Sequence, residues 1–289
     1  MRMYIPNLNK NGLGGGWTFL NNLLKAIKTD VQIAHSVEDC DIMFICGPTM
    51  VGRDEVELAN KLGKKIIFRV DNIPEDYRNR GTAISRLKDY SKMADVVVYQ
   101  SEWARNYVKT LTCVDGAVIF NGVDRDIFNK DNRTDNYKQY LYVRSSTNEN
   151  KRWQEAKFFF REYWMTADNH ELELIVVGNF SDYVKLYGDD FINRYKLGAF
   201  DEPIKYLGQI NDPRRMAEIY KTSAVLIAPY YNDACSNTIL EARACGCEID
   251  LCLSGNSGGT PEILALSDEL IGIDRMGKEY LGLFNLVMQ

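Results

Sequence analysis

The segment Ala228–Ala242 combines residue types that suit a phosphorylated, hydroxyl-rich ligand. We expect an apolar strand to end near its start, a loop to carry Asp233, and a helix to open near Ser236 or Asn237, with Glu241 one turn inside. The free backbone N–H groups of a helix N-terminus favour a phosphate. Ionised carboxylates accept hydrogen bonds from sugar and ribose hydroxyls. Taken singly, an Asp in a turn and a Glu on a helix face also have ordinary structural explanations.

A second cluster, RSSTNENKR at 144–152, follows another expected strand and offers cations and short hydroxyls. A diphosphate requires cations that reach its oxygens, and arginine can bind them with two parallel hydrogen bonds. Arg144 and Lys151 are candidates, and Ser145–Thr147 add hydroxyl donors. Lys151 leads into a helix whose N-terminus would supply further donors. The structural alternative is a solvated loop that caps this helix.

Glycines gather between the first expected strand and the first expected helix, at Gly12 and at Gly14, Gly15 and Gly16. Such residues let backbone N–H groups approach an anion at a helix N-terminus. The spacing does not match the dinucleotide-binding fingerprint, because Trp17 stands where the last glycine of that fingerprint would be. The cluster predicts a ligand-facing loop, with a flexible turn as the alternative.

The stretch FRVDN at 68–72 is expected to end a strand, where the polar groups of a doubly wound sheet face its ligand crevice. Arg69 and Asp71 alternate along an extended chain, so we expect both side chains on one face. A salt bridge that only closes the loop is an equally acceptable interpretation.

Composition excludes few classes of protein. The net charge of −5 and the pI of about 5.3 argue against nucleic acid as the main partner, because proteins that bind it carry a basic face. No segment approaches the roughly 20 consecutive apolar residues that cross a bilayer. The first residues read as a strand and a loop rather than as a secretory signal, so we expect a cytoplasmic protein.

The chain has seven cysteines, which we expect to be reduced thiols because most lie in apolar, strand-like runs. Cys245 and Cys247 with Cys252 raise the question of a metal site. Both histidines of the chain lie far away in sequence, and no second cysteine pair has the spacing of a zinc finger. We therefore expect no metal and no cofactor.

Short apolar runs alternate with helix-length amphipathic stretches along the chain, which predicts parallel strands with crossover helices. In the first half the expected strands are Met3–Pro6, Val31–His35, Asp41–Cys46, Lys65–Val70, Val96–Gln100 and Ala117–Phe120, and the helices Gly16–Lys28, Asp54–Leu62, Thr82–Met93 and Glu102–Lys109. In the second half they are strands Tyr140–Arg144, Glu173–Val177, Ile204–Leu207, Val225–Ala228 and Glu248–Leu253, and helices Arg152–Trp164, Asp212–Thr222 and Asn237–Cys245.

The polar, turn-rich stretch Asn129–Asn136 interrupts this alternation and is the expected linker. The fold predicted is α/β, with two Rossmann-like, doubly wound parallel-sheet domains. The first would span residues 1–130 and bind the acceptor, and the second would span 137–289 and bind the donor. One large sheet is the alternative.

The segment from Tyr206 to Gly246 resembles retaining nucleotide-sugar glycosyltransferases of the GT-B fold, the glycosyl transferases of group 1. The hallmark of this family is an acidic pair separated by seven residues, matched here by Asp233 and Glu241. Further similarity lies in Asn121–Asp124 with Phe128, in Val177-Gly178, and in Gly258–Glu262. The resemblance covers Tyr140 to Glu262 well and the first half loosely.

The resemblance implies a role for each of these residues. Glu241 would hold the nucleotide ribose, Asp233 would lie near the transferred sugar, and Arg144 and Lys151 would neutralise the departing diphosphate without a metal. Ser236, Asn237 and Thr238 would bind sugar and diphosphate oxygens, and Gly178 would line the donor site. On the acceptor side the candidates are Asp71, Arg69 and the loop Gly14–Gly16.

The chain departs from the family pattern at several positions. Asp233 is one methylene shorter than the usual Glu, and Arg144 and Lys151 are farther apart than the family's pair, so Arg152 is a candidate substitute. Asp71 stands near the position of a histidine that the family often has. The chain ends soon after the last motif, so we expect the terminal helix that returns to the first domain in this family to be short or absent.

The predicted function is transfer of a sugar, with retention of configuration, from a nucleoside-diphosphate sugar to a glycan, lipid-linked or small-molecule acceptor. Closure of the two domains would exclude water during transfer. The alternatives are a nucleotide-sugar epimerase or hydrolase and a non-catalytic nucleotide-sugar-binding protein. A glycosyltransferase that modifies nucleic acid is disfavoured by the acidic pI.

Overall fold

A computed structural model describes residues 1–8, 14–71, 73–74, 83–134, 136–167, 171–188, 191, 203–252 and 255–289. Gly12 and the expected element ends at Thr82 and Leu253 lie outside these residues. The chain forms two compact units. Unit 1 comprises Met1–Val123, Asp233–Asn237 and Gly258–Gln289, and unit 2 comprises Asp124–Asn232 and Thr238–Ser257.

Unit 1 contains a parallel sheet whose strand order is β2-β1-β3-β4-β5-β6. Its central strands are short apolar runs with buried side chains, which is typical of parallel sheets covered on both faces. The strands are β1 (Arg2–Tyr4), β2 (Gln32–Ile33), β3 (Ile42–Ile45), β4 (Lys65–Arg69), β5 (Val96–Tyr99) and β6 (Ala117–Val118).

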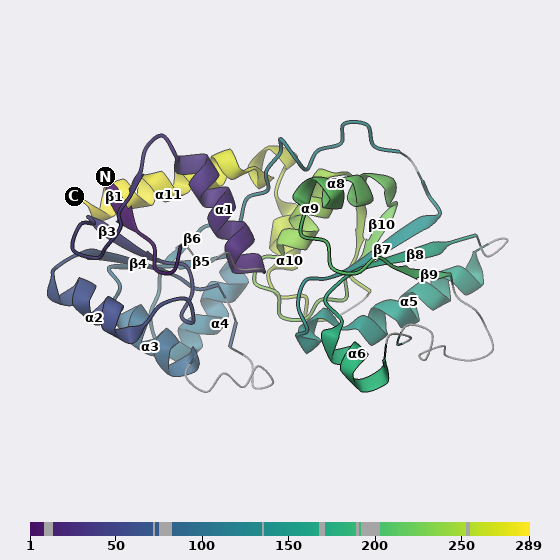
Figure 1. Cartoon of the computed structure of the whole chain (residues 1–289), viewed down its shortest axis with the longest axis horizontal. Helices are drawn as coiled ribbons and strands as arrows, with labels where there is room; N and C mark the ends of the chain where they lie inside the picture. Colours follow the sequence, from purple (N-terminus) through teal and green to yellow (C-terminus); the bar gives the residue numbers. More distant parts are fainter. Residues whose placement is uncertain are drawn as a thin grey trace. The chain divides into compact units, whose positions relative to one another are not determined.

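Helices cover both faces of this sheet (Figure 1). On one face lie α2 (Arg53–Lys61), α3 (Ala83–Met93) and α4 (Glu102–Thr112), and on the other lie α1 (Gly15–Ile27) and α11 (Ile273–Val287). The α4 helix begins after Ser101, whose hydroxyl accepts a hydrogen bond from Ala104 N, a common N-cap arrangement.

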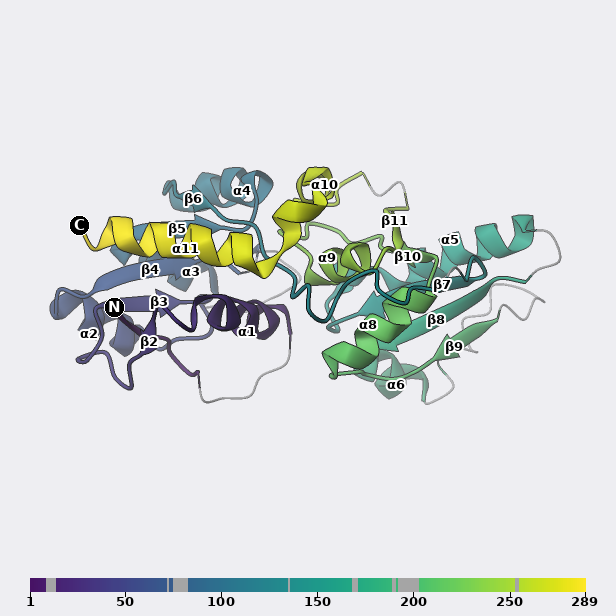
Figure 2. The same cartoon turned by 90° about the horizontal axis from the view of Figure 1, so that it is seen from above.

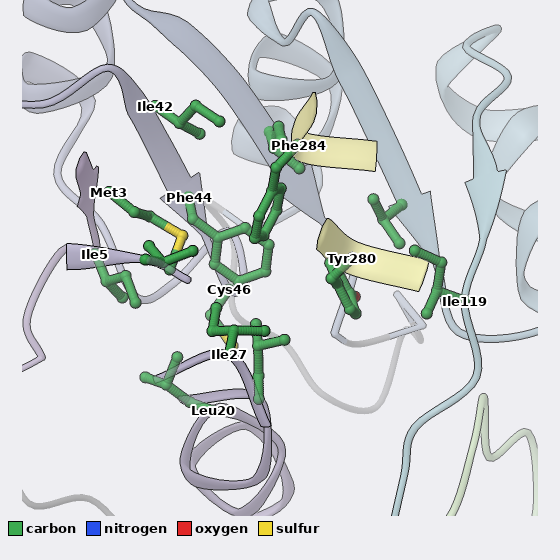
Figure 3. Close-up of a cluster of buried hydrophobic side chains, with 14 of the residues drawn as sticks. Met3, Ile5, Leu20, Ile27, Ile42, Phe44, Cys46, Ile119, Tyr280 and Phe284 are labelled. Atoms are coloured by element: carbon green, nitrogen blue, oxygen red, sulfur yellow. The ribbon is translucent and has the colours of Figure 1, made fainter. Parts of the chain in front are cut away.

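The terminal helix α11 packs against α1 and the first sheet, which corrects the expectation that it would be short or absent. In Figure 3, Tyr280 and Phe284 of α11 lie beside Phe44 of β3, with ring centroids 5.7 and 6.0 Å apart. The two helices approach closely because Gly277 has no side chain, since a Cβ there would lie 2.7 Å from Ala26 Cβ. Figure 2 shows them running along the same sheet.

Because of this packing, the residue boundaries of the compact units differ from those of the predicted domains 1–130 and 137–289. Residues 258–289 group with the first sheet, because the apolar face of α11 is buried against it. The expected linker Asn129–Asn136 falls in unit 2, where Arg133 donates to the carbonyls of Tyr220 and Cys245.

Unit 2 contains a second parallel sheet, with the strand order β11-β10-β7-β8-β9. Its strands are β7 (Gln139–Arg144), β8 (Glu173–Gly178), β9 (Ile204–Tyr206), β10 (Val225–Ile227) and β11 (Glu248–Asp250). In Figure 1, α5 (Trp153–Thr166) and α6 (Ser181–Tyr187) lie on one face, and α8 (Pro213–Thr222) and α9 (Asn237–Ala244) on the other. The α8 helix begins with Asp212 as a side-chain cap and proline at its first position.

The predicted fold class, with its two doubly wound sheets, is confirmed. In unit 1 the chain passes from β1 outward to β2 and then back to β3, and in unit 2 it builds β7, β8 and β9 before placing β10 on the other side of β7. Such a reversal is a topological switch point, beside which ligands bind at the carboxyl ends of the strands. Within the part of the chain that the structure describes, no helix has the length and apolar character to span a bilayer.

Candidate functional site

The switch point of unit 2 brings together the loops that follow β7 and β10. Tyr231 N donates to Asn150 O at 2.8 Å, and Tyr230 Oη donates to Val143 O at 2.6 Å. Since both segments contain predicted donor-site residues, their contact at the carboxyl ends of β7 and β10 supports a common site.

Two cations of this edge lie over tyrosine rings. Lys151 Nζ is 4.1 Å from the ring centroid of Tyr230, and Arg152 Cζ is 4.6 Å from that of Tyr231. A cation–π contact stabilises a positive charge without neutralising it. Arg152 also forms an ion pair with Glu155 at 2.8 Å, and its backbone adopts the left-handed conformation. The Arg152–Glu155 pair is partly exposed and therefore weak, so both cations contribute positive charge at the carboxyl end of β7.

Arg144 is engaged differently. Both terminal nitrogens of its buried guanidinium bind the carboxylate of Asp182, at 2.5 and 2.7 Å, and they also donate to Asn179 O and Thr147 O. Burial works to raise the pKa of Asp182, but the hydrogen bonds and charge of Arg144 outweigh it and hold that pKa below its ordinary value. Arg144, which was predicted to bind a diphosphate, therefore has its terminal N–H groups occupied and its charge paired.

Gly178 ends β8 and supports this arrangement. Its φ is +133°, and a Cβ on it would lie 2.0 Å from Arg144 O, so only glycine fits. Asn179 N then donates to Arg144 O at 2.8 Å. Gly178 therefore shapes the loop that holds Arg144.

Glu241 lies on α9 and accepts a hydrogen bond from Tyr220 Oη, at 3.1 Å from its Oε2. Burial raises the pKa of Glu241 to about 7, while the bond from Tyr220 lowers it. The nearby Tyr230, whose ring lies beneath Lys151, contributes to the raised pKa of Tyr220. The carboxylate and the cations therefore belong to one connected region of unit 2.

The segment Asp233–Asn237 groups with unit 1. Asp233 is partly exposed, its carbonyl accepts from Gly259 N at 2.8 Å, and Ser236 is buried. Asn237 Nδ2 donates to Gly15 O at 3.1 Å. Thr238, the next residue, is buried in unit 2.

The switch point of unit 1 gathers most of the predicted acceptor-side residues. Gly14, Gly15 and Gly16 form the start of α1, with φ +115° at Gly14. A Cβ on Gly16 would lie 3.5 Å from Asp71 Oδ2, and a Cβ on Gly47, after β3, would lie 2.4 Å from the Asp71 carboxyl. The Asp71 carboxyl therefore lies in a cradle formed by Gly16 and Gly47, beside the loop Gly14–Gly16.

Arg69 lies beneath this edge and is fully buried. Its guanidinium carbon is 3.6 Å from the Phe19 ring centroid, and Nη2 donates to Asn121 Oδ1 at 2.9 Å. The side chains of Arg69 and Asp71 both lie toward α1, which agrees with their predicted shared face. Among the ion pairs of the described residues none includes Arg69. Its contacts with Phe19 and Asn121 give it a packing role beneath the carboxyl end of β4.

Asn121 connects Arg69 to the donor segment. Its Nδ2 lies within hydrogen-bonding distance of Gln100 Oε1, Cys235 O and Asn237 Oδ1, at 2.9–3.1 Å. This buried amide therefore holds the Asp233–Asn237 segment within unit 1. This residue opens the Asn121–Asp124 motif quoted for the family resemblance.

The Gly258–Glu262 motif has a structural task in unit 1. Both carboxylate oxygens of Glu262 accept hydrogen bonds from the N-terminus of α4, from Glu102 N and Trp103 N, each at 2.7 Å. A carboxylate satisfies free donors at a helix N-terminus. A Cβ on Gly259 would lie 2.2 Å from Ala234 O, so this glycine permits close contact with the Asp233–Asn237 segment.

The partners of these groups were not predicted from the sequence. Asp182 binds Arg144, Tyr220 binds Glu241, and Tyr230 and Tyr231 hold the two cations. The tyrosine pair stands directly after an expected strand, beside candidate ligand groups, and that position is a usable signal. Asp182 and Tyr220 carry no local signal, because their partners lie 38 and 21 residues away.

All seven cysteines are free thiols, and six of them are buried. Burial raises the pKa of Cys235, Cys245 and Cys247, to about 12, 12 and 11. These thiols are therefore protonated and unreactive near neutral pH.

Residues 139–271 match the family model described as Glycosyl transferases group 1. No curated protein sequence matches the chain. The family match begins at β7, ends before α11, and includes the candidate donor residues in that range.

Solved structures share the fold over nearly the whole chain. Anabaena HepE in complex with UDP-glucose is 11% identical, with a TM-score of 0.72 over 99% of this chain and 100% of that one. Sucrose-phosphate synthase from Thermosynechococcus elongatus is 13% identical, with a TM-score of 0.62 over 100% and 96%. AviGT4, a glycosyltransferase of avilamycin A biosynthesis, is 12% identical, with a TM-score of 0.63 over 100% and 98%. These similarities establish the GT-B fold.

Proposed function

We propose that the chain is a glycosyltransferase that moves a sugar from a nucleoside-diphosphate donor to an acceptor. The observation that carries this proposal is the switch point of unit 2, where Lys151 and Arg152 keep positive charge on tyrosine rings in the same connected region as Glu241. A diphosphate requires such cations, and a ribose diol requires such an acceptor. The match to the group 1 family model supports the same chemistry.

We assign Lys151 and Arg152 to the diphosphate and Glu241 to the ribose. Lys151 and Arg152 would stabilise the charge that develops on the leaving diphosphate, without a metal and with retention of configuration. Arg144 would add to the positive potential only if the diphosphate drew it away from Asp182. Asp233 would contact the transferred sugar, with backbone groups of Ser236, Asn237 and Thr238 on its oxygens.

The acceptor would bind unit 1 at the cradle of Asp71 and the loop Gly14–Gly16. A carboxylate there can accept the proton of an attacking hydroxyl. A glycan, a lipid-linked sugar and a small hydroxylated molecule all present such a group. We place the protein in the cytoplasm, where its free thiols stay reduced.

The experiment that tests the donor site is a thermal-shift screen of nucleoside diphosphates and their sugars, beginning with UDP and UDP-glucose. A ligand at 100 times its dissociation constant stabilises the folded protein by about 2.7 kcal/mol. We expect a shift for the wild type and a much smaller one for Glu241→Ala. An equal shift in both proteins would contradict the assignment of Glu241. The anomeric configuration of the product, followed by proton NMR, tests retention.

The Arg144–Asp182 ion pair favours one alternative, a protein that binds nucleotide sugars without transferring them. Pairing removes one of the two cations that the group 1 resemblance assigns to the leaving group. Tight binding of UDP-glucose with neither transfer nor hydrolysis, over a broad set of hydroxylated acceptors, would support this alternative. Release of free sugar or an epimer from the donor alone would instead indicate a hydrolase or epimerase.

A further inference from the structure

A buried tyrosine is the one described side chain that hydrogen-bonds the carboxylate of Glu241. Tyr220 has no exposed surface, and its ring packs edge-on against Phe128 with centroids 6.1 Å apart. From this position its hydroxyl donates to Glu241 Oε2 at 3.1 Å. Because packing fixes the ring, the hydroxyl is a preorganised donor rather than a mobile one.

The two oxygens of Glu241 have different surroundings. Oε2 is held by Tyr220, whereas Oε1 has no hydrogen bond from any described residue, and the side chain is partly exposed. An ionised carboxylate that has one oxygen anchored keeps acceptor capacity on the other. This is the state required to accept hydrogen bonds from a vicinal diol.

We propose that Tyr220 is a positioning residue of the donor site, which orients Glu241 toward the ribose hydroxyls and favours the carboxylate over the protonated carboxyl. The inference rests on the proposed function, because it assumes that Glu241 binds the nucleotide. It adds a residue of α8 that contacts no substrate and acts only through Glu241.

Donor affinity then depends on pH through Glu241. Burial raises its pKa to about 7, and the Tyr220 hydrogen bond opposes this rise. A protonated carboxyl loses acceptor capacity, so nucleotide binding weakens as the pH falls through 7.

The titratable and charged groups around the pair come from several elements. They are Tyr220 and Lys221 on α8, Tyr230 after β10, Cys245 and Cys247 after α9, and Arg133 before β7. The pKa of Cys245 is raised to about 12 and that of Cys247 to about 11, and burial raises the pKa of Tyr220 well above its ordinary value. Near pH 7 these thiols and this phenol stay neutral, which leaves Glu241 as the group that changes charge there.

The first test measures the carboxyl of Glu241 without a ligand. Carbon-13 NMR of glutamate-labelled protein follows its titration, and the resonance is assigned by its loss in Glu241→Gln. We expect a midpoint near 7 in the wild type and a higher midpoint in Tyr220→Phe, which keeps the ring and removes the hydroxyl. An unchanged midpoint in Tyr220→Phe would overturn the proposal.

The second test measures the dissociation constant of UDP between pH 6 and pH 9 for the same proteins. We expect Tyr220→Phe to bind UDP roughly five- to tenfold more weakly at pH 7, with much of the affinity regained at pH 9. Glu241→Gln should lose the pH-dependent step. Tyr163→Phe is the matched control, because it removes a tyrosine hydroxyl that binds a different carboxylate of unit 2, Asp250.

The outcomes separate the two proposals. If the wild type binds no nucleoside diphosphate at any pH, the proposed function fails. If UDP binds with the Glu241-dependent pH profile and Tyr220→Phe shows the wild-type midpoint, only the role of Tyr220 fails. If Tyr163→Phe shifts the profile as much as Tyr220→Phe, the effect is general destabilisation and the positioning role is likewise overturned.

Discussion

The two switch points occupy equivalent places in two parallel sheets, and each has a buried arginine. The partners of the two arginines differ in charge. In unit 1 the guanidinium of Arg69 lies over Phe19 and binds the neutral amide of Asn121. In unit 2 the guanidinium of Arg144 is clamped by the carboxylate of Asp182. The sequence presents both as an arginine at the end of an apolar strand, yet only one is paired with an acid among the described residues.

This difference bears on which cations can serve a ligand. Removing the acid from a buried pair leaves an uncompensated charge, which is strongly unfavourable, so Arg144 is held in place. Two further cations of unit 2, Lys151 and Arg152, lie over tyrosine rings. The ion pair of Arg152 with Glu155 is partly exposed and therefore weak. In unit 1 the chemistry lies with an anion, Asp71, in its glycine cradle.

The largest effect is expected for Lys151→Ala in unit 2. If this lysine carries the diphosphate, its loss removes a charge-assisted hydrogen bond and weakens UDP binding by roughly 10- to 100-fold. Isothermal titration calorimetry measures the change. Lys138→Ala is the control, because that lysine is exposed in the same unit and forms a surface ion pair with Glu171. Equal affinities for the two variants would remove Lys151 from the site.

In unit 1 the corresponding change is Gly47→Ala, which places a methyl group against the carboxyl of Asp71. Overpacking should destabilise the fold by about 1–2 kcal/mol in denaturant unfolding. The double variant with Asp71→Ala should recover most of that loss, since the clash disappears. Gly282→Ala is the control, because its Cβ would meet open space. Strictly additive effects in the double variant would show that Gly47 does not shape the cradle.

Asp182→Asn tests the clamp on Arg144 directly. Because Asp182 is partly exposed, we expect a loss of only about 1 kcal/mol at neutral pH. The pKa of Asp182 is lowered in the folded protein, so its contribution is present above the ordinary carboxyl pKa and is lost as the pH falls through the lowered value.

Unfolding curves of the wild type and Asp182→Asn should therefore converge in acid. A difference in stability between the two proteins that persists at low pH would mean that charge pairing does not cause the difference. UDP affinity measured on the same variant tests whether the released Arg144 adds to the diphosphate site.

Glu241→Gln tests the carboxylate of unit 2 in the absence of a ligand. The pKa of Glu241 is raised from 4.5 to about 7 by folding, so the wild type loses stability as the pH rises through this interval. The glutamine variant avoids that loss. We expect its melting temperature to exceed that of the wild type by roughly 5–10 °C at pH 8, with a smaller gap at pH 5. A gap that does not grow with pH would contradict a raised pKa.

Much of the fold could be predicted from the sequence, since short apolar runs such as Ile42–Ile45 and Val225–Ile227 are typical of buried parallel strands. The alternation of such strands with capped helices predicted two doubly wound sheets. The return of α11 to unit 1 was not predicted, because it depends on the fit of Gly277 against Ala26 and of two aromatic rings against Phe44. Packing of this kind leaves no local pattern.

The candidate site divides in the same way. Sequence alone placed Arg144, Lys151, Asp71 and Glu241 at strand ends and a helix start, because local periodicity determines where an element ends. Only the tertiary structure decided that β10 lies beside β7, that Asp182 occupies Arg144, and that Tyr220 holds Glu241. The physical reason is that charge state and availability depend on neighbours in space, and those neighbours are brought together by the burial of apolar faces far apart in the chain.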